Sequence, residues 1–388
     1  MTTERLYHHD SYLVEFRATV VDTAEEGRRI YLDRTAFYPA SGGQPQDTGW
    51  IAGAAVIEVV DEGGRIAHLT SAPVLGGEAA CRLDWPRRFD HMQQHSGQHL
   101  LSAVLVEMFG AATVGFHLGA EASSIDAALV SLDPAQAAAV ERRANEVVFE
   151  NRPLAISFEE SPLGLRKPSE RQGPLRIVSI QGLDRSACGG THVRATGEIG
   201  PILLRKLDKA HGSVRIEFLC GLRAVRRARA DYDALAKIAR HFSAPLDETP
   251  ALVWAQVQAL DVSEKARRRL ATELARLRGG ELYRATAPNP AGLRSVLERL
   301  PQGTALDDEL RATAQGFTTG SKALFLAVVE EPPALLLAAS KDAGLHAGDL
   351  VKSAVIRCGG RGGGNAQLAQ GSLPTREALE QAVKQLMP

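Results

Sequence analysis

Residues 91–99 read HMQQHSGQH, and residues 186–193 read SACGGTHV. Side chains four apart share one face of a helix, so the histidines of HSGQH direct two imidazoles toward one point. In the second stretch, two glycines between a cysteine and a histidine suit a tight turn that folds thiol and imidazole onto one ion. Three imidazoles and a thiolate are typical of tetrahedral zinc. The predicted ligands are His95, His99, Cys188 and His192.

Each half of this pattern also has a plainer interpretation. The chain has 11 histidines, so a pair four apart arises by chance, and a buried hydrogen-bonded histidine is commoner than a metal ligand. His91 lies on the same expected helix face and could pair with His95 instead. The CGGTH turn favours a metal site, and His91 is then left to support or pack beside the ligands.

Composition limits the class of protein. A chain of 388 residues that is 44% hydrophobic can bury a large core and should form two or three domains. Its four cysteines are too sparse for a disulfide framework. The start, MTTERLYHHDSY, has no apolar signal core, and no run of apolar residues is long enough to cross a membrane. We therefore expect a cytoplasmic protein with no membrane segment.

Total charge gives no hint of nucleic acid binding, because the net charge is -1. Local basic clusters exist, and each is interpreted as a solvated face in preference to a phosphate contact. The first cluster is Arg166, Lys167, Arg171 and Arg176, and the second is Arg223, Arg226, Arg227 and Arg229.

The first segment is predicted to be a small β-barrel. The β-type runs VEFRATVV, RRIYLD, AAVIEVV and AACRLD are separated by Gly- and Asp-rich turns. From Phe89 to Phe109 the pattern changes to a helix that carries the histidine pair. Strands and helices then alternate, and LRIVSI places the CGGTH turn beside a sheet. We predict an N-terminal barrel over residues 1–88 and an α/β core over residues 89–220.

The second half is predicted to hold an arm and a further domain. Between Ala251 and Gly279, apolar residues fall near a heptad stripe, which indicates a helical hairpin or a short coiled-coil arm. Two apolar runs, a helix and GGRGGGNAQLAQG follow a Gly- and Pro-containing boundary. We predict a helical arm over residues 221–285 and a C-terminal α/β domain over residues 286–388. The fold class is α+β with several domains.

Four stretches resemble the editing domain of alanyl-tRNA synthetase and its freestanding relatives, the AlaX proteins. They are TAFYPASGGQPQDTG, HSGQHLL, GFHLGAEASSID and CGGTHVRATGEIG. The tail, with SKDAGLHAGDLV before its glycines, resembles the DHH-associated C-terminal domain of those synthetases. The synthetase places an aminoacylation domain before the editing domain, whereas this chain starts at the barrel. The resemblance is therefore to the long form of AlaX, and we expect no charging of tRNA.

The resemblance implies trans-editing, that is, hydrolysis of misacylated tRNA(Ala), chiefly Ser-tRNA(Ala), with Gly-tRNA(Ala) as a second candidate. A synthetase pocket for alanine cannot firmly reject serine or glycine, since one small group changes binding by only about 1 to 3 kcal/mol. The resemblance also implies one zinc ion per chain, held by the four ligands above. Two rival interpretations remain: a non-catalytic zinc-containing tRNA-binding module, and a deacylase of another specificity, such as Ser-tRNA(Thr).

The role of the zinc is open. Four protein ligands make a closed site of the structural kind. The ion could expand to five ligands, lose one ligand when substrate binds, or hold the substrate's amino or hydroxyl group while water attacks. We favour a positioning role.

Substrate residues are expected around the SGGQ stretch. The Thr35 hydroxyl could hydrogen-bond the seryl hydroxyl, which alanine lacks, or Thr35 could serve only as a strand-forming residue. Gly42 and Gly43 let the backbone approach closely, and Gln44 offers amide donors to the ester or the terminal adenosine. Thr35, Gln44 and His117 are the catalytic candidates, and Glu121 is a substrate-binding candidate together with the two glycines. A glutamine that the synthetase carries after its histidine is Ala120 here, so no role is transferred for it.

The C-terminal region is expected to choose the tRNA. By resemblance, residues 286–388 help to bind the tRNA near its elbow, through Arg357, Arg361 and the glycine-lined backbone. The same region supports dimer formation in the synthetase, so a homodimer is a further expectation.

Overall fold

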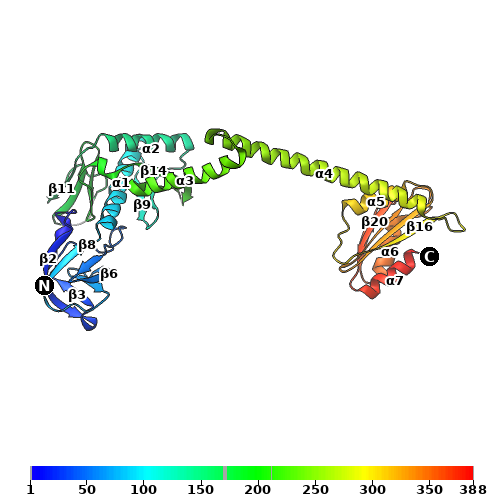
Figure 1. Cartoon of the computed structure of the whole chain (residues 1–388), viewed down its shortest axis with the longest axis horizontal. Helices are drawn as coiled ribbons and strands as arrows, with labels where there is room; N and C mark the ends of the chain where they lie inside the picture. The colour runs from blue at the N-terminus through cyan, green and yellow to red at the C-terminus, as the bar shows by residue number, and fades with distance from the viewer. Residues whose placement is uncertain (1, 169–172, 211, 388) are drawn as a thin grey trace. The chain divides into compact units, whose positions relative to one another are not determined.

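The computed structural model describes residues 2–168, 173–210 and 212–387. The chain forms two compact units, residues 1–238 and residues 239–388 (Figure 1). Both units combine helices with sheets, one of which closes into a barrel, so the predicted α+β multidomain class is confirmed. None of the helices in the described ranges is long and apolar enough to cross a membrane.

The predicted N-terminal barrel is present in unit 1. Six strands close in the order β2-β3-β7-β6-β5-β8. Their bounds are β2 (Glu15–Ala24), β3 (Arg29–Leu32), β5 (Gly49–Ile51), β6 (Ala54–Asp61), β7 (Ile66–Thr70) and β8 (Gly77–Leu83). Alternation along β8 sends Ala79, Cys81 and Leu83 into the barrel core. Beside the barrel, β1 (Glu4–Arg5) pairs in parallel with β4 (Arg34–Thr35).

A long central helix, α1 (Trp85–Phe109), follows the barrel directly. It starts at Trp85 and not at Phe89, because the Asp84 side chain accepts the Arg87 N–H and a proline occupies the first turn. Every residue from His91 to Leu105 is buried. The histidine pair therefore lies in a stretch of helix that is enclosed on all sides.

Two antiparallel sheets enclose α1. One sheet has the order β14-β15-β10-β9 and the other β11-β12-β13. The strands are β9 (Thr113–Leu118), β10 (Ser123–Ala127), β11 (Leu154–Glu159), β12 (Leu175–Ile180), β13 (Asp184–Ala187), β14 (Ile202–Ala210) and β15 (Ser213–Cys220). Helix α1 contacts strands of both sheets, and α2 (Pro134–Phe149) packs against α1 and β14.

The segment predicted as an arm consists of α3 (Gly221–Phe242) and α4 (Thr249–Ala285). Most of the heptad side chains of α4 are exposed, among them Leu260 at 60% and Leu277 at 68%. Near its C-terminal end, Gly279 lies against the backbone of Thr313 in α5 (Asp308–Thr318), so this end of α4 is part of unit 2. The three predicted boundaries between the four domains remain predictions.

Unit 2 is a sheet covered by helices on both faces. The strand order is β16-β17-β18-β20-β19, with a parallel β16-β17 pair. Alternate residues of β17 (Ala323–Glu330) enter two separate cores, one with α5 and the other with α6 (Ala347–Arg357) and α7 (Arg376–Leu386). The remaining strands are β16 (Arg294–Leu300), β18 (Pro333–Ala339), β19 (Arg361–Gly364) and β20 (Leu368–Ser372).

Candidate metal centre

The four predicted ligands come together in unit 1. Their ligand atoms all lie within 4.8 Å of one another. His95 and His99 project from successive turns of α1, while Cys188 and His192 lie in the loop after β13. The Cys188 sulfur is 3.5 Å from His95 Nε2 and 3.3 Å from His192 Nε2. This group could therefore hold a metal ion.

The CGGTH turn packs directly on the first histidine. A Cβ added to Gly190 would stand 2.2 Å from His95 Cε1. A tight turn was the predicted reason for a glycine here, but Gly190 does not have a positive φ. Close approach of an imidazole ring, and not a left-handed turn, requires glycine here.

Each imidazole is also held at its other nitrogen. The three contacts are Gln44 Oε1 to His95 Nδ1 at 2.8 Å, Asp184 Oδ2 to His99 Nδ1 at 3.2 Å and Ser96 Oγ to His192 Nδ1 at 3.1 Å. An amide oxygen and a carboxylate can only accept, so His95 and His99 carry a proton on Nδ1 when neutral. This tautomer leaves the Nε2 lone pair facing the other ligands, which is the arrangement that a metal-binding histidine needs.

Electrostatics at the group favour an anionic sulfur. Although burial opposes it, the charges of His95 and His192 hold the pKa of Cys188 well below its usual value. Burial lowers the pKa of His99, but hydrogen bonds to Asp184 and Cys188 outweigh it and raise that pKa to about 9. Burial and the charge of His95 lower the pKa of His192 to about 3. A pKa of about 9 keeps His99 protonated near pH 7 in the metal-free group, so binding of an ion through His99 Nε2 would release that proton. The thiolate and neutral imidazoles that then remain are the donor set that fits zinc.

A tight turn presents the SGGQ stretch to this group. Ser41 and Gln44 exchange two backbone hydrogen bonds of 3.2 and 3.0 Å. Between them, Gly42 and Gly43 have φ values of 54° and 81°, which glycine adopts without strain. The Phe116 ring lies 2.7 Å from the place of a Cβ on Gly43. Both conformation and space therefore require glycine at Gly43.

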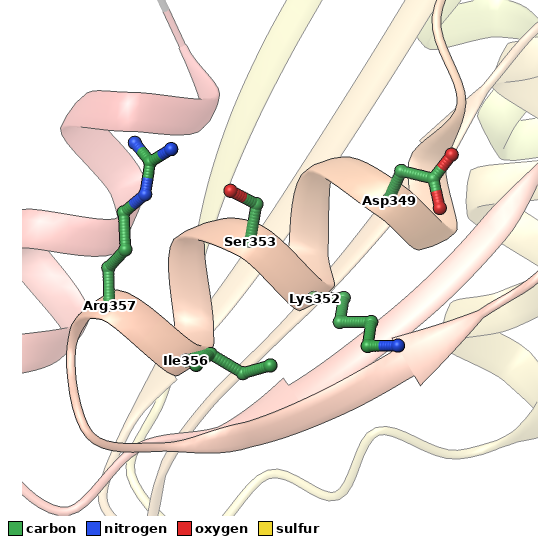
Figure 2. Close-up of a pocket in the computed structure, with 5 residues that line it drawn as sticks. All are labelled: Asp349, Lys352, Ser353, Ile356 and Arg357. Carbon is green, nitrogen blue, oxygen red and sulfur yellow. The ribbon is translucent and has the colours of Figure 1, made fainter.

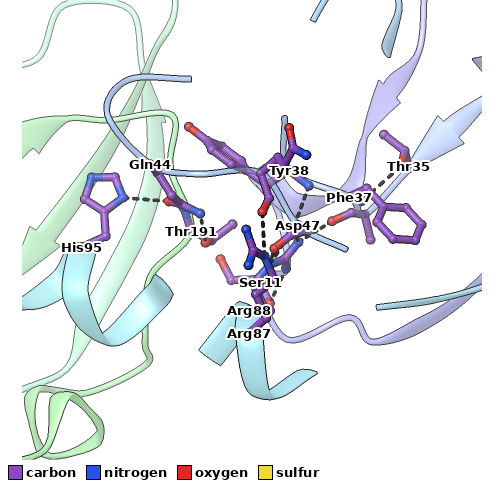
Figure 3. Close-up of polar contacts among 12 residues, drawn as sticks. Ser11, Thr35, Phe37, Tyr38, Gln44, Asp47, Arg87, Arg88, His95 and Thr191 are labelled. Atoms are coloured by element: carbon purple, nitrogen blue, oxygen red, sulfur yellow. Dashed lines mark hydrogen bonds and ion pairs between the residues drawn. The ribbon is translucent and has the colours of Figure 1, made fainter. Parts of the chain in front are cut away.

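Gln44 links this turn to the loop after β13 that carries Cys188 and His192, called the metal loop below (Figure 3). Besides His95 Nδ1, its Oε1 accepts the Thr191 N–H at 3.1 Å, and its amide group donates to Thr191 Oγ1 at 2.8 Å. Gln44 is 2% exposed. These contacts orient His95, and they leave one amide proton for the predicted contact with a substrate.

A buried ion pair between Asp47 and Arg88 fixes the loop that contains the SGGQ stretch to the first turn of α1 (Figure 3). Arg88 and Asp47 are 0% and 1% exposed, and Arg88 Nη2 lies 2.5 Å from Asp47 Oδ2. The same carboxylate oxygen accepts the Tyr38 N–H at 2.6 Å. Arg88 Nη1 also donates to the Ser11 carbonyl at 2.8 Å. The pair therefore joins the N-terminal segment, the SGGQ loop and helix α1, which carries two of the candidate ligands.

Thr35 is fully buried, and its hydroxyl is already engaged. Its Oγ1 lies 2.9 Å from His68 Nε2 and accepts the Phe37 N–H at 3.1 Å. Burial lowers the pKa of His68 to about 4, and its Nδ1 faces the Ile30 carbonyl at 3.2 Å. A neutral His68 protonated on Nδ1 must accept at Nε2, so Thr35 donates its proton to His68. One lone pair of the Thr35 oxygen is left to accept a further hydrogen bond.

The chain is similar to known editing proteins over almost its whole length. It is 31% identical over 406 aligned residues to the alanyl-tRNA editing protein AlaX-L of Pyrococcus horikoshii, and the match covers 99% of this chain and 98% of that protein. The chain belongs to the alanyl-tRNA editing protein family. This family assignment confirms the resemblance seen in the motifs.

Other comparisons agree with membership in this family. The chain is 30% identical to the alanine–tRNA ligase of Pyrococcus abyssi, over 99% of this chain and 44% of the ligase. It is 33% identical to the alanyl-tRNA editing protein Aarsd1 of Mus musculus, over 57% of this chain and 60% of that protein. Residues 175–217 match the threonyl and alanyl tRNA synthetase second additional domain, and residues 308–387 match the DHHA1 domain.

Two further predicted site residues, His117 and Glu121, lie at and just after the end of β9. Phe116 and His117 are neighbours on β9, so their side chains leave opposite faces of the sheet. Phe116 is the one that faces the SGGQ turn, and its ring centroid is 6.1 Å from that of His95. His117 and Glu121 are exposed, and the contacts of the described residues do not join them to the metal group. Their predicted roles remain predictions.

The two predicted tRNA-binding arginines lie in unit 2. Arg357 ends α6 and lines a cavity of about 350 Å³ together with Lys352 and Asp349 (Figure 2). Arg361 begins the glycine strand β19 and is exposed. Both side chains are thus available on the surface of that unit.

His91 is outside the ligand group. It is 4% exposed, and its Nδ1 has no hydrogen-bond partner among the described residues. Burial lowers its pKa to about 4. A neutral, buried imidazole one turn before His95 is consistent with the predicted packing role.

The first basic cluster is not simply a solvated face, so that interpretation was wrong for two of its members. Arg166 Nε lies 2.8 Å from Asp184 Oδ1, on the carboxylate that holds His99, and Arg176 is 8% exposed. Arg171 lies outside the described residues. In the second cluster, Arg223 is also buried and pairs with Asp90 at 2.6 Å.

Proposed function

We propose that the chain is a zinc-dependent deacylase that edits misacylated tRNA(Ala) in trans, chiefly Ser-tRNA(Ala), with Gly-tRNA(Ala) as a second substrate. Relatives named as alanyl-tRNA editing proteins support hydrolysis of mischarged aminoacyl-tRNA as the reaction class. The observation that carries the proposal is the four-ligand group, in which each imidazole is oriented by its own partner. Extended similarity to AlaX-L supports the trans-acting form.

The four ligands would hold one zinc ion, which would supply a Lewis acid able to bind the substrate's amino or carbonyl group. The substrate would approach the ligand group from the side of the Cys188 sulfur. The three histidines are at most 4% exposed, whereas Cys188 is partly exposed and Gly189 is exposed. An ester placed there meets the exposed Gly42–Gly43 turn and Phe116, which would orient it and limit the water around it.

Thr35 is the candidate that reads serine. Its hydroxyl gives its proton to His68, so it would act toward substrate as an acceptor, and a seryl hydroxyl is a donor. An alanyl ester offers no such donor and would forgo the bond. We expect Thr35→Val to reduce the ratio of Ser-tRNA(Ala) to Ala-tRNA(Ala) hydrolysis about ten-fold, while Thr35→Ser retains it. Equal ratios in Thr35→Val and wild type would refute this role.

The remaining parts of the proposal concern the binding partners and the cellular location. Unit 2 would bind the body of tRNA(Ala) through Arg357 and Arg361, and a homodimer would form through the C-terminal region. A cytoplasmic location fits a translation-editing role.

The first experiment is deacylation of purified Ser-tRNA(Ala), Gly-tRNA(Ala), Ala-tRNA(Ala) and Ser-tRNA(Thr), with zinc measured in the same sample. Loss of serine from tRNA(Ala), with the alanyl ester spared, is the expected result. Preference for Ser-tRNA(Thr) would identify a deacylase of another specificity. Zinc present without hydrolysis of any ester would identify a non-catalytic tRNA-binding module.

Removal of a ligand tests the site itself. We expect Cys188→Ala to lower bound zinc and deacylation together, because the sulfur is one of the four donors. Cys358→Ala is the matched control, since Cys358 is a free cysteine in unit 2. Normal turnover in a zinc-free Cys188→Ala protein would show that the metal is dispensable.

A further inference from the structure

Arg176 lies behind the Cys188 side of the metal group, and no role has been assigned to it so far. It projects from β12, and its side chain makes two charge-assisted bonds to backbone carbonyls. Nη1 donates to the Cys188 carbonyl at 2.6 Å, and Nε donates to the His8 carbonyl at 2.9 Å. The guanidinium therefore ties the metal loop to the N-terminal segment.

The charge of Arg176 has no carboxylate partner among the described residues. Buried arginines are almost always paired, and the two other buried arginines in the described part of the chain follow that rule, Arg88 with Asp47 and Arg223 with Asp90. Among the described residues, Arg176 makes no hydrogen bond and no ion pair to an acidic side chain. Its buried Nη2 has no hydrogen-bond acceptor there. Its positive charge must be balanced by something else.

The backbone carbonyl that Arg176 holds at 2.6 Å belongs to Cys188, one of the four predicted metal ligands. A cysteine binds a metal ion as the thiolate. A bound ion would therefore place an anionic sulfur on the residue that the unpaired guanidinium contacts.

We propose that Arg176 is a positioning residue of the metal centre, whose guanidinium both holds the Cys188 turn by its carbonyl and neutralises the metal-bound sulfur. The proposal rests on the metal site of the proposed function but not on its substrate. A cation beside a thiolate withdraws electron density from the sulfur, so the sulfur donates less to the ion and the ion becomes a stronger Lewis acid. The backbone bonds set the place of the sulfur, and the charge sets its donor strength.

Two substitutions separate these two effects. Arg176→Lys keeps the charge but cannot make both carbonyl bonds in the planar geometry of a guanidinium. Arg176→Gln removes the charge and keeps a donor. The control is Arg185→Gln on the neighbouring strand β13, because Arg185 is partly exposed and its charge is already paired with Glu159 at 2.8 Å.

The probe is Co²⁺ bound to the full-length protein, with affinity measured by chelator competition and the sulfur-to-cobalt charge-transfer band measured by absorption. We expect Arg176→Lys to bind Co²⁺ about ten-fold or more weakly, as is typical when a group supporting a metal ligand is lost. The loss in Arg176→Gln should be smaller, because removal of the nearby cation strengthens the sulfur donor and opposes the loss of support. The band should move to lower energy in Arg176→Gln, because the sulfur becomes a stronger donor, and should stay at the wild-type position in Arg176→Lys and Arg185→Gln.

Wild-type affinity in both Arg176 variants would overturn the proposal, and so would weaker binding with an unmoved band in Arg176→Gln. If Arg176→Gln does not fold, Arg176→Lys decides: weaker binding at the wild-type band position supports the proposal, and unchanged affinity overturns it. A wild-type protein that binds no Co²⁺ through sulfur also overturns it. No tRNA enters this assay, so a protein inactive on every ester could still show the expected cobalt spectra.

Discussion

Replacing Arg88 by methionine should be among the most damaging single changes in unit 1. The substitution keeps much of the side-chain volume but removes a guanidinium that is 0% exposed. Asp47 would lose its bonds from Nε, at 3.0 and 3.1 Å, and from Nη2, at 2.5 Å. The carbonyls of Ser11 and Ala36 would lose their donors as well.

The expected cost follows from the charge that stays behind. Removing one partner of a buried ion pair typically costs about 3 to 5 kcal/mol, because the other charge is left buried and uncompensated. Asp47 keeps the Tyr38 N–H at 2.6 Å, which offsets part of this loss. We therefore expect the free energy of unfolding of unit 1 to fall by about 3 kcal/mol.

The assay is urea unfolding of the full-length chain, with zinc content measured beside it. Asp47→Asn combined with Arg88→Met should be less destabilised than Arg88→Met alone, because no charge is then left unpaired. Arg87→Met is the matched control in the same turn, since Arg87 is only partly buried and bonds a single carbonyl, that of Gln46. A loss below about 1 kcal/mol in Arg88→Met, or a double variant no better than the single one, would refute the reasoning.

Three further predictions concern the site and the barrel. Gln44→Leu should weaken zinc binding about 10- to 100-fold in a chelator competition, because His95 loses its Nδ1 acceptor; unchanged affinity would count against the orienting role. Since burial lowers the pKa of His68 to about 4 from 6.5, the folded protein binds fewer protons than the unfolded chain between these pH values. The contribution of the neutral His68 to the free energy of unfolding is fully present above pH 6.5. It is lost as the pH falls, by about 3 kcal/mol at pH 4. The free energy of unfolding in urea should therefore fall less between pH 7 and pH 4 in His68→Gln than in wild type. An equal fall in both proteins would contradict this. Gly43→Ala should destabilise the turn by about 1 to 3 kcal/mol through strain at its φ of 81° and contact with the Phe116 ring; a thermal melt equal to that of wild type would exclude this strain.

Local patterns predicted the elements of the site well. The barrel strands alternate with a period of two, and the histidine pair repeats at the period of a helix, so both can be identified from short stretches of sequence. A glycine pair between Cys188 and His192 pointed to a turn that brings thiol and imidazole together. The structure adds the reason for Gly190, which is the imidazole of His95 packed on its backbone.

The groups that orient the ligands could not be predicted in this way. Gln44, Asp184 and Ser96 meet their histidines across 51, 85 and 96 residues of chain, and no local period marks such a pairing. Asp184 lies close before the CGGTH stretch, which is a signal that could have suggested it. Nothing near Ser96 or in the SGGQ turn identifies a particular histidine as its partner.

Charge runs were misleading for a related reason. Arg166 and Arg176 look like members of a solvated basic stretch, because their neutralising groups are distant in sequence. In the fold, Arg166 meets the carboxylate of Asp184, and Arg176 lies beside Cys188. Conversely, the heptad residues of α4 look like a packed seam, yet Leu260 and Leu277 are exposed.

The distribution of these contacts implies that binding of a metal ion would be coupled to the folding of unit 1. Helix α1 and the loop after β13 each supply two of the four candidate ligands, and Gln44 from the barrel segment contacts both His95 and Thr191 of that loop. An unfolded chain has none of these pairings, so it would bind the ion far more weakly than the folded protein does. Binding free energy then adds to folding free energy, and it adds to the barrel as well as to the core, because Gln44 joins the two.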